Sequence, residues 1–188
     1  MRLVIMGPPG AGKGTQAEAL ARRIEGAHIS TGDIFRDNVS RQTELGRTAQ
    51  RYMDAGEYVP DSVTNAMVRD RLAQPDARDA FLLDGYPRTP DQVAELDSIL
   101  SDLGTQLDAA LALTVDPEEL IARLLKRAET SGRSDDTEDV IRHRQEVYTA
   151  ETAPLLNVYR ERGLLVEVDG MGSVDEVAAR IDAALPKA

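Results

Sequence analysis

The feature that most constrains the fold is a glycine-rich loop near the start of the chain. The segment GPPGAGKGT, residues 7–15, follows the apolar run 3–6 and precedes a stretch in which apolar residues recur three and four positions apart. A strand, a glycine-rich turn and a helix in this order form a phosphate-binding loop, because glycines let successive N–H groups approach an anion at the positive end of the helix dipole. Lys13 adds a full positive charge. The pattern therefore predicts a site for the phosphates of a nucleoside triphosphate.

One position departs from the usual pattern G-x-x-x-x-G-K-[ST]. Gly14 follows Lys13 where a serine or threonine is expected, and Thr15 comes one place later. The residues alone therefore leave open whether a side chain next to the lysine ligates Mg²⁺. A glycine-rich turn that binds no ligand is the alternative, but the placement between a strand and a helix favours phosphate binding.

Short apolar runs alternate with helical patterns along the chain. Strands are predicted near residues 3–6, 27–29, 80–83, 109–115 and 164–168, with helical stretches between them. This alternation is typical of a parallel sheet that is buried on both faces. Because 188 residues is the length of one domain, we predict a single α/β domain over 1–188. It consists of a five-stranded parallel sheet covered by helices on both faces.

Two stretches depart from this simple alternation. A helical insert over about 31–59 follows the second strand, and a polar loop interrupts the pattern over 130–136. Such excursions above a sheet are where lids form. The helix predicted over 117–128 precedes that loop. The one predicted over 138–162 contains Pro154, where we expect a kink or boundary because proline lacks a backbone N–H.

Composition excludes several classes of function. The chain has no cysteine and two histidines, which excludes disulfides, cysteine-bound zinc, thiol catalysis and a site made of several histidines. A net charge of −11 disfavours nucleic acids and anionic membranes as partners. No apolar run approaches the roughly 20 residues of a membrane span, and the first residues lack the pattern of a signal peptide. We therefore expect a cytoplasmic protein.

Two further segments place polar groups at predicted strand ends. They are STGDIFR, residues 30–36, and LDGYPRT, residues 83–89. Ligands of α/β sheets bind at the carboxyl ends of strands, and the planar guanidinium groups of Arg36 and Arg88 suit a phosphate monoester. Thr31 also fits a helix N-cap and Arg36 an exposed surface position. Together with the glycine-rich loop, the segments favour a second phosphate site.

These segments together resemble the adenylate kinase family. The motifs GPPGAGKGT, STGDIFR, GEYVPD and DGYPRT occur in the order and with the spacing of that family, and the resemblance spans essentially the whole chain. The family's own loop has a glycine before the threonine, so the departure at Gly14 supports the resemblance. It implies the fold of P-loop nucleoside monophosphate kinases and reversible phosphoryl transfer from Mg-ATP to AMP. The products would be two ADP, and the role would be adenine nucleotide homeostasis.

The resemblance also implies roles for individual residues. ATP would be bound by Gly10, Ala11, Gly12, Lys13, Gly14, Thr15, Arg123, Arg127 and Gly172. AMP would be bound by Thr31, Arg36, Glu57, Tyr58, Val59, Gly85, Tyr86, Pro87, Arg88, Gln92, Arg133 and Arg144, with Gln92 reading the adenine. The catalytic cations would be Lys13, Arg88, Arg127, Arg133 and Arg144. Without the resemblance, an exposed helix position explains Gln92 equally well, and the charged fraction of 29% favours solvated helix faces for Arg123 and Arg144.

The metal and the lid follow from the same resemblance. Asp84 ends a predicted strand and would hold Mg²⁺ through water molecules. Many family members have a long lid, sometimes with cysteine-bound zinc, but only about 128–137 is available here and cysteine is absent. The chain thus resembles the short-lid form, and zinc is not expected. Tyr86 stands where the family often has phenylalanine, which we interpret as neutral.

The predicted residues suit the chemistry of this reaction. The phosphate of AMP is already an anionic nucleophile, so the scarcity of histidine is no obstacle. The barrier lies in bringing two polyanions together, which requires fixed cations in the cleft. An overall charge of −11 does not conflict with this, because the local field decides. We expect ATP, AMP and ADP as the partners and a monomer, since one cleft with its own lids needs no second chain.

Three alternatives remain at this stage. A kinase for another monophosphate, such as UMP or CMP, would have a similar core and a different acceptor pocket. A GTPase-like switch is disfavoured because the chain has no Asn-Lys-x-Asp motif. A P-loop kinase of small metabolites is disfavoured only by the resemblance.

Overall fold

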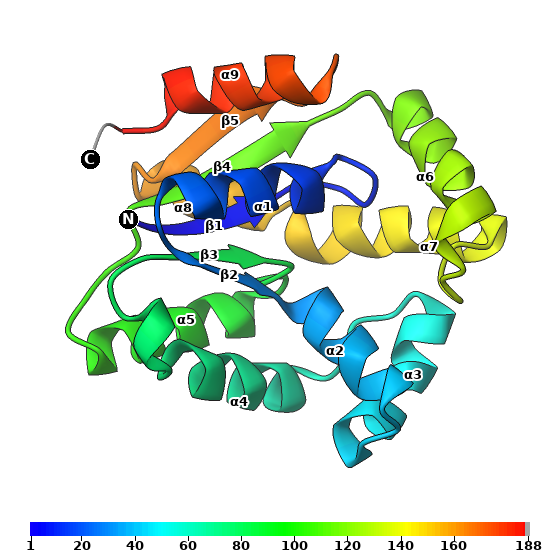
Figure 1. Cartoon of the computed structure of the whole chain (residues 1–188), viewed down its shortest axis with the longest axis horizontal. Helices are drawn as coiled ribbons and strands as arrows, with labels where there is room; N and C mark the ends of the chain where they lie inside the picture. Colours follow the sequence, from blue (N-terminus) through cyan, green and yellow to red (C-terminus); the bar gives the residue numbers. More distant parts are fainter. Residues whose placement is uncertain (187–188) are drawn as a thin grey trace.

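A five-stranded parallel sheet forms the centre of the molecule (Figure 1). The computed structural model describes residues 1–186. The strands lie in the order β2-β3-β1-β4-β5. Their bounds are β1 Arg2–Met6, β2 Ala27–Ser30, β3 Phe81–Asp84, β4 Ala109–Thr114 and β5 Leu165–Asp169. The predicted fold class is therefore confirmed.

Helices cover both faces of the sheet because its strands are apolar on both sides. In β1, Leu3 and Ile5 face one core and Val4 and Met6 face the other, as the alternation of side chains along a strand requires. The first core is closed by α1 Lys13–Arg23, α6 Pro117–Ser131 and α9 Val174–Ala184. The second is closed by α4 Asp61–Leu72, α5 Pro90–Asp102 and α8 Leu155–Glu161.

The remaining helices extend beyond the sheet. In Figure 1, α2 Thr31–Ser40 and α3 Glu44–Ala55 project past the end of β2, opposite the tips of α6 and of α7 Glu138–Val147. A small apolar core around Phe35, Ala49 and Val59 holds α2 and α3 together. A short 3₁₀ helix, Pro75–Ala77, precedes β3. Within residues 1–186, no helix combines the length and the apolar character that crossing a membrane demands.

Two helix boundaries differ from the predictions. α6 continues to Ser131, past its predicted end near residue 128, so residues 130–131 of the predicted loop are helical and the irregular part begins at Gly132. The helix predicted over 138–162 is divided: α7 ends at Val147, a π-helical turn spans Tyr148–Thr152, and α8 begins at Leu155. The boundary expected at Pro154 is confirmed, since this residue caps α8.

Candidate functional site

The glycine-rich loop joins β1 to α1 at the carboxyl end of the sheet. Its backbone passes so close to α6 that a Cβ on Gly10, whose φ is +89°, would lie 2.9 Å from the carbonyl oxygen of Leu120. Only glycine fits there. Lys13 is the first residue of α1, and its ammonium donates to the carbonyl oxygens of Gly7 at 2.7 Å and Pro8 at 3.0 Å. The loop thus forms a preformed cradle with a cation beside it.

Burial sets the acidity of that cation. It lowers the pKa of Lys13 from its usual 10.5 to about 8, and the neighbouring cations Arg88 and Arg144 lower it further while Asp84 opposes them. A buried ammonium close to two guanidinium groups lacks sufficient negative charge around it. The cradle is therefore electrostatically suited to a polyanion.

A second pocket lies at the carboxyl ends of the paired strands β2 and β3. Thr31 is the first residue of α2, and its hydroxyl donates to the carbonyl oxygen of Gly85 at 3.0 Å. The capping role considered for Thr31 belongs to Ser30, whose hydroxyl accepts from the Asp33 N–H. Gly85 has a φ of +83°, and a Cβ there would meet the Thr31 hydroxyl and the Arg88 guanidinium. This glycine allows the two side chains to lie together.

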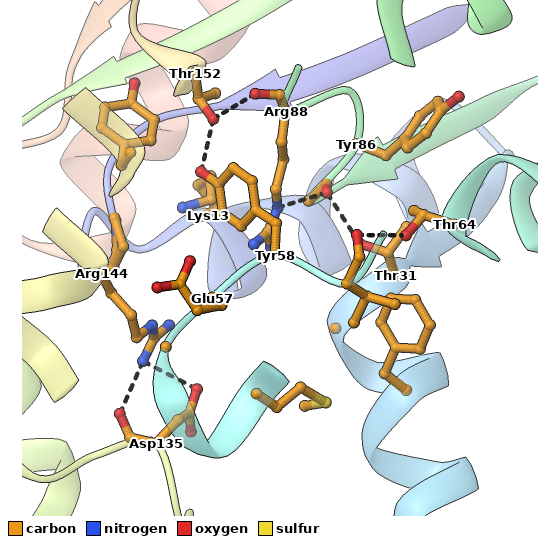
Figure 2. Close-up of a pocket in the computed structure, with 18 of the residues that line it drawn as sticks. Lys13, Thr31, Glu57, Tyr58, Thr64, Tyr86, Arg88, Asp135, Arg144 and Thr152 are labelled. Atoms are coloured by element: carbon orange, nitrogen blue, oxygen red, sulfur yellow. Dashed lines mark hydrogen bonds and ion pairs between the residues drawn. The ribbon is translucent and has the colours of Figure 1, made fainter. Parts of the chain in front are cut away.

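Arg88 is held by its own turn, by Tyr58 and by the π-helical turn between α7 and α8. Its Nε donates to the Gly85 carbonyl oxygen at 2.7 Å, and its guanidinium lies 5.0 Å from the centre of the Tyr58 ring. Thr152, in the π-helical turn, donates to the Arg88 carbonyl oxygen at 2.8 Å and bonds with the Tyr58 hydroxyl at 2.7 Å. Figure 2 shows this arrangement, with Lys13 beside it. These contacts fix the position and orientation of the Arg88 guanidinium.

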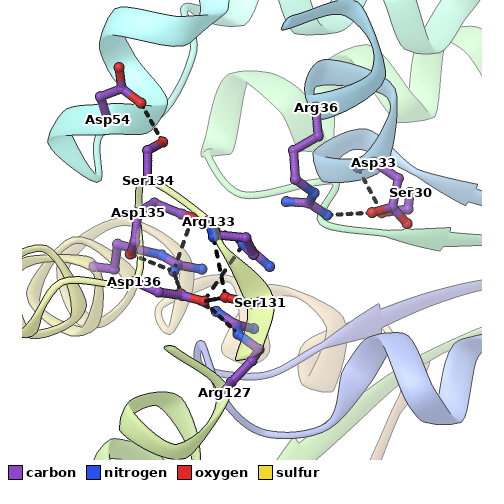
Figure 3. Close-up of polar contacts among 11 residues, drawn as sticks. Ser30, Asp33, Arg36, Asp54, Arg127, Ser131, Arg133, Ser134, Asp135 and Asp136 are labelled. Atoms are coloured by element: carbon purple, nitrogen blue, oxygen red, sulfur yellow. Dashed lines mark hydrogen bonds and ion pairs between the residues drawn. The ribbon is translucent and has the colours of Figure 1, made fainter. Parts of the chain in front are cut away.

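Three arginines converge on two adjacent carboxylates after α6 (Figure 3). Arg127 pairs with Asp136 at 2.5 Å, and Arg133 pairs with Asp135 at 2.8 Å. Arg144, from α7, lies 3.1 Å from Asp135 and 3.4 Å from Asp136. The Asp136 side chain is only 2% exposed. Because like charges repel at this spacing, the two carboxylates are what allow three guanidinium groups to gather.

The ionisation of this cluster follows from burial and pairing. Burial lowers the pKa of Arg144 to about 10, so this arginine is still charged at neutral pH. Burial alone would raise the pKa of Asp135, but the hydrogen bond from Arg133 and the charge of Arg144 hold it below its usual value. Asp135 and Asp136 were not among the residues predicted from the sequence. Two adjacent aspartates close to Arg127, Arg133 and Arg144 along the chain were a signal that could have identified them.

The cleft consists of two adjoining pockets. The acceptor-side pocket is lined by all the residues predicted for AMP: Thr31, Arg36, Glu57, Tyr58, Val59, Gly85, Tyr86, Pro87, Arg88, Gln92, Arg133 and Arg144. The loop-side pocket is lined by most of those predicted for ATP: Gly10, Gly12, Lys13, Gly14, Thr15, Arg123 and Arg127. Both pockets are lined by Lys13, Arg36, Arg88, Arg133 and Arg144. The structure thus places cations where the two pockets meet.

Several predicted residues have surroundings that sequence alone did not indicate. Ala11, within the loop, packs its side chain into the first core, which leaves only its backbone for a ligand. Arg123 donates to Glu119 at 2.8 Å and to the Gly170 carbonyl oxygen at 3.3 Å, which brings it to the turn that contains Gly172. Arg36 pairs with Asp33. Gln92 is 1% exposed, so the alternative of an exposed helix position is wrong.

Asp84 has the surroundings that a water-bound Mg²⁺ would require. It ends β3, lines the loop-side pocket and is 13% exposed at its side chain. A Cβ on Gly14 would lie 3.8 Å from its Oδ2, so the carboxylate faces the start of α1. Residues 1–186 contain no group of three or more His, Cys, Asp or Glu side chains that could hold a metal. Mg²⁺ usually takes one or two carboxylates, waters and substrate phosphates, which this donor set fits.

Comparison with known proteins agrees with this geometry. Residues 5–164 match the sequence model of the family described as adenylate kinase. A protein named adenylate kinase from a Nocardioides species is 62% identical over 185 residues, which is 98% of this chain and 97% of that relative. Adenylate kinases from Kocuria rhizophila and Thermobifida fusca are 61% and 57% identical, over 99% and 98% of both chains respectively. The chain belongs to the adenylate kinase family.

Proposed function

We propose that this chain transfers a phosphoryl group reversibly from Mg-ATP to AMP and so produces two ADP. The observation that carries the proposal is the set of cations shared by the two pockets, among them Lys13, Arg88 and Arg144. A cleft that binds two phosphorylated ligands needs positive charge most where their phosphates meet. The reaction named by the relatives requires that arrangement.

Each part of the cleft has a distinct task in the proposed reaction. The N–H groups of the loop and Lys13 hold the outer phosphates of ATP, while Arg36 and Arg88 hold the phosphate of AMP. An oxygen of AMP attacks the γ-phosphorus, and the bond from that phosphorus to the β,γ-bridging oxygen breaks. ADP leaves with the bonding electrons, and no proton has to be removed. Arg127, Arg133 and Arg144 stabilise the charge on the group in transit.

Asp84 is the residue that we propose for the metal. Bound Mg²⁺ would neutralise charge on the ATP phosphates, and Asp84 would hold its water ligands. Replacing Asp84 by alanine should raise the Mg²⁺ concentration needed for half-maximal activity. An unchanged requirement in a magnesium titration would remove Asp84 from this role.

Segments 31–59 and 128–137 are proposed as the acceptor-binding insert and the lid that enclose the substrates. Two contacts of the insert support this: the Ser134 hydroxyl, in the lid segment, lies 2.5 Å from Asp54, and His143, in the following helix α7, lies 2.6 Å from Glu57. Gly56 packs against α7, since a Cβ there would come within 3.0 Å of Arg144. Closing a cleft in this way keeps water from the activated phosphoryl group.

The direct test is a substrate panel. ATP and Mg²⁺ are supplied with AMP, UMP, CMP, GMP or IMP, and ADP formation is measured. AMP should be the best acceptor, and ATP without any acceptor should be hydrolysed only slowly because the cleft closes on both substrates. A preference for UMP or CMP would reassign the acceptor, and rapid hydrolysis of ATP alone would contradict an enclosed site.

We further propose that the enzyme acts as a cytoplasmic monomer without nucleic acid or membrane partners. The groups assigned to both nucleotides come from one chain, and its charge of −11 disfavours polyanionic partners. Sedimentation at micromolar concentration should give the mass of one chain, and cell fractionation should recover the activity in the cytoplasmic fraction.

A further inference from the structure

Gln92 is buried on the acceptor side of the cleft with its amide fixed by two neighbours. Its Oε1 accepts from the backbone N–H of Arg88 at 2.7 Å, and its Nε2 donates to Asp61 Oδ1 at 2.8 Å. The residue lines the acceptor-side pocket and is 1% exposed. A side-chain amide normally has two nearly equivalent orientations that differ by exchange of oxygen and nitrogen. Here the neighbours distinguish them.

The two neighbours require the same orientation for independent reasons. A backbone N–H can only donate, so the atom facing Arg88 must be the oxygen of Gln92. A carboxylate can only accept, so the atom facing Asp61 must be the nitrogen. Reversing the amide would place two donors together at Arg88 and two acceptors together at Asp61. Unsatisfied buried polar groups of this kind are costly.

Asp61 is itself held in place. It is the first residue of α4, and its other oxygen, Oδ2, accepts from the Thr89 hydroxyl at 2.8 Å. Thr89 is the N-cap of α5, and its hydroxyl oxygen accepts from the backbone N–H of Gln92 at 3.2 Å. The start of α4, the cap of α5 and Gln92 thus form one hydrogen-bonded unit. Because the carboxylate of Asp61 can only accept, it decides which neighbouring groups donate.

This arrangement leaves Gln92 with one free acceptor position on Oε1 and one free donor position on Nε2, which cannot be exchanged. Adenine presents the complementary pair, a donor at N6 and an acceptor at N1. Hypoxanthine and guanine present the reverse pair, an acceptor at O6 and a donor at N1, and the O4 and N3 edge of uracil is likewise reversed.

We propose that Asp61 is a positioning residue that fixes the amide of Gln92 and thereby makes the site select 6-amino over 6-oxo purines. The proposal rests on the proposed function and on the role that the family resemblance implies for Gln92, which is to read the base of the acceptor.

AMP and IMP are the sharpest pair of probes, because they are similar in size and differ at this edge. The measured quantity is the ratio of kcat/KM for AMP to kcat/KM for IMP at saturating Mg-ATP. In Asp61→Ala only the Arg88 N–H still orients the amide. We expect the ratio to fall by about tenfold or more, since a hydrogen bond to a charged acceptor is lost. A purely structural defect would lower both values together and leave the ratio unchanged.

Asp61→Asn is the rescue variant. Its Oδ1 can still accept from Gln92, and its amide nitrogen can donate to Thr89, so the ratio should stay within about threefold of the original.

Asp91→Ala is the matched control, because Asp91 is an exposed carboxylate in the first turn of α5, next to Gln92. It should leave the ratio unchanged. If Asp61→Ala folds poorly, Asp61→Ser replaces it, since serine is tolerated at helix starts and is too short to reach Gln92.

Gln92→Ala distinguishes a failure of the role of Asp61 from a failure of the role of Gln92. If it lowers the ratio while Asp61→Ala and Asp61→Ser do not, Gln92 reads the base without help from Asp61 and the inference is overturned. If Gln92→Ala leaves the ratio unchanged, Gln92 does not read the base, and the inference fails while the proposed phosphoryl transfer stands. A ratio that falls in Asp61→Ala and in Gln92→Ala but not in Asp61→Asn is the result expected.

Discussion

The glycine-rich loop and the arginine cluster of Arg127, Arg133 and Arg144 both present positive charge to the cleft, but they are built differently. The loop uses backbone N–H groups and one lysine, placed by the strand and helix on either side of it. The cluster uses three side chains, from α6, from the segment after it and from α7, gathered by Asp135 and Asp136. The loop is thus a local structure, whereas the cluster depends on tertiary contacts. We therefore expect single substitutions in the two regions to act differently.

The largest effect is expected at Arg88, which lines both pockets of the cleft. Replacing Arg88 by alanine should lower kcat at least about 10²-fold, because a guanidinium aimed at the transferring charge is lost. The melting temperature should change little. Arg142→Ala is the control, since Arg142 is 55% exposed and pairs with Glu138 on the surface of α7. Near-normal turnover in Arg88→Ala would exclude Arg88 from the mechanism.

The next effect tests whether the arginine cluster depends on its carboxylates. In Asp136→Asn, Arg127, Arg133 and Arg144 keep their charges but lose a buried counter-ion. They should move apart, and kcat should fall between about 10- and 100-fold, because misplaced groups lose much of their effect. Steady-state kinetics measures this. The exposed Asp139, in the first turn of α7, gives the control Asp139→Asn. Equal rates in the two variants would show that the cluster gathers without Asp136.

The contribution of the loop should instead be seen in the pH dependence of kcat/KM for ATP. Burial lowers the pKa of Lys13 to about 8, so the free enzyme holds the charged form below that pH and the neutral form above it. ATP binds the charged form better, so kcat/KM for ATP should fall above pH 8, by up to about tenfold per unit. At saturating ATP the bound phosphates keep Lys13 protonated, and kcat/KM for AMP should stay level. A level profile for ATP as well would contradict the role of Lys13.

The smallest effect concerns stability alone. Asp116 caps α6, the helix that carries Arg123 and Arg127, by accepting from the N–H groups of Glu118 and Glu119. Asp116→Ala should lower the free energy of unfolding by about 1 kcal/mol and leave kcat unchanged. Thr137→Ala is the matched control, because Thr137 precedes α7 without a side-chain cap hydrogen bond. Thermal unfolding of both variants measures the difference. If Asp116→Ala also slowed turnover, the placement of these arginines would depend on the cap.

Much of the fold could be predicted from periodicity. The five strands and their helices are recognisable because parallel strands buried on both faces are short and continuously apolar, as in Ala109–Leu113 of β4. The division between α7 and α8 was harder. Pro154 indicated a boundary, but the π-helical turn Tyr148–Thr152 has no sequence signal of its own. In this turn Thr152 donates to the carbonyl oxygen of Arg88, which is a tertiary contact that no local sequence pattern predicts.

The candidate site divides in the same way. Motif spacing identified Lys13, Thr31 and Arg88, since the segments that carry them follow strands. Asp61 and Asp136 were not identified, because a carboxylate at a helix start or in a polar loop is usually a surface residue. Only contacts across the fold, from Asp61 to Gln92 and from Asp136 to Arg127, give them a part in the site.

By itself the sequence determined the α/β alternation, the phosphate-binding loop and the family to which the chain belongs, because these depend on residues close together along the chain. Tertiary structure alone decided how Gln92 is oriented and how Arg127, Arg133 and Arg144 share two carboxylates. The physical reason is the range of the interactions. Backbone conformation and helix capping act over a few residues, whereas hydrogen bonds and charge pairs act through space between segments that only folding brings together.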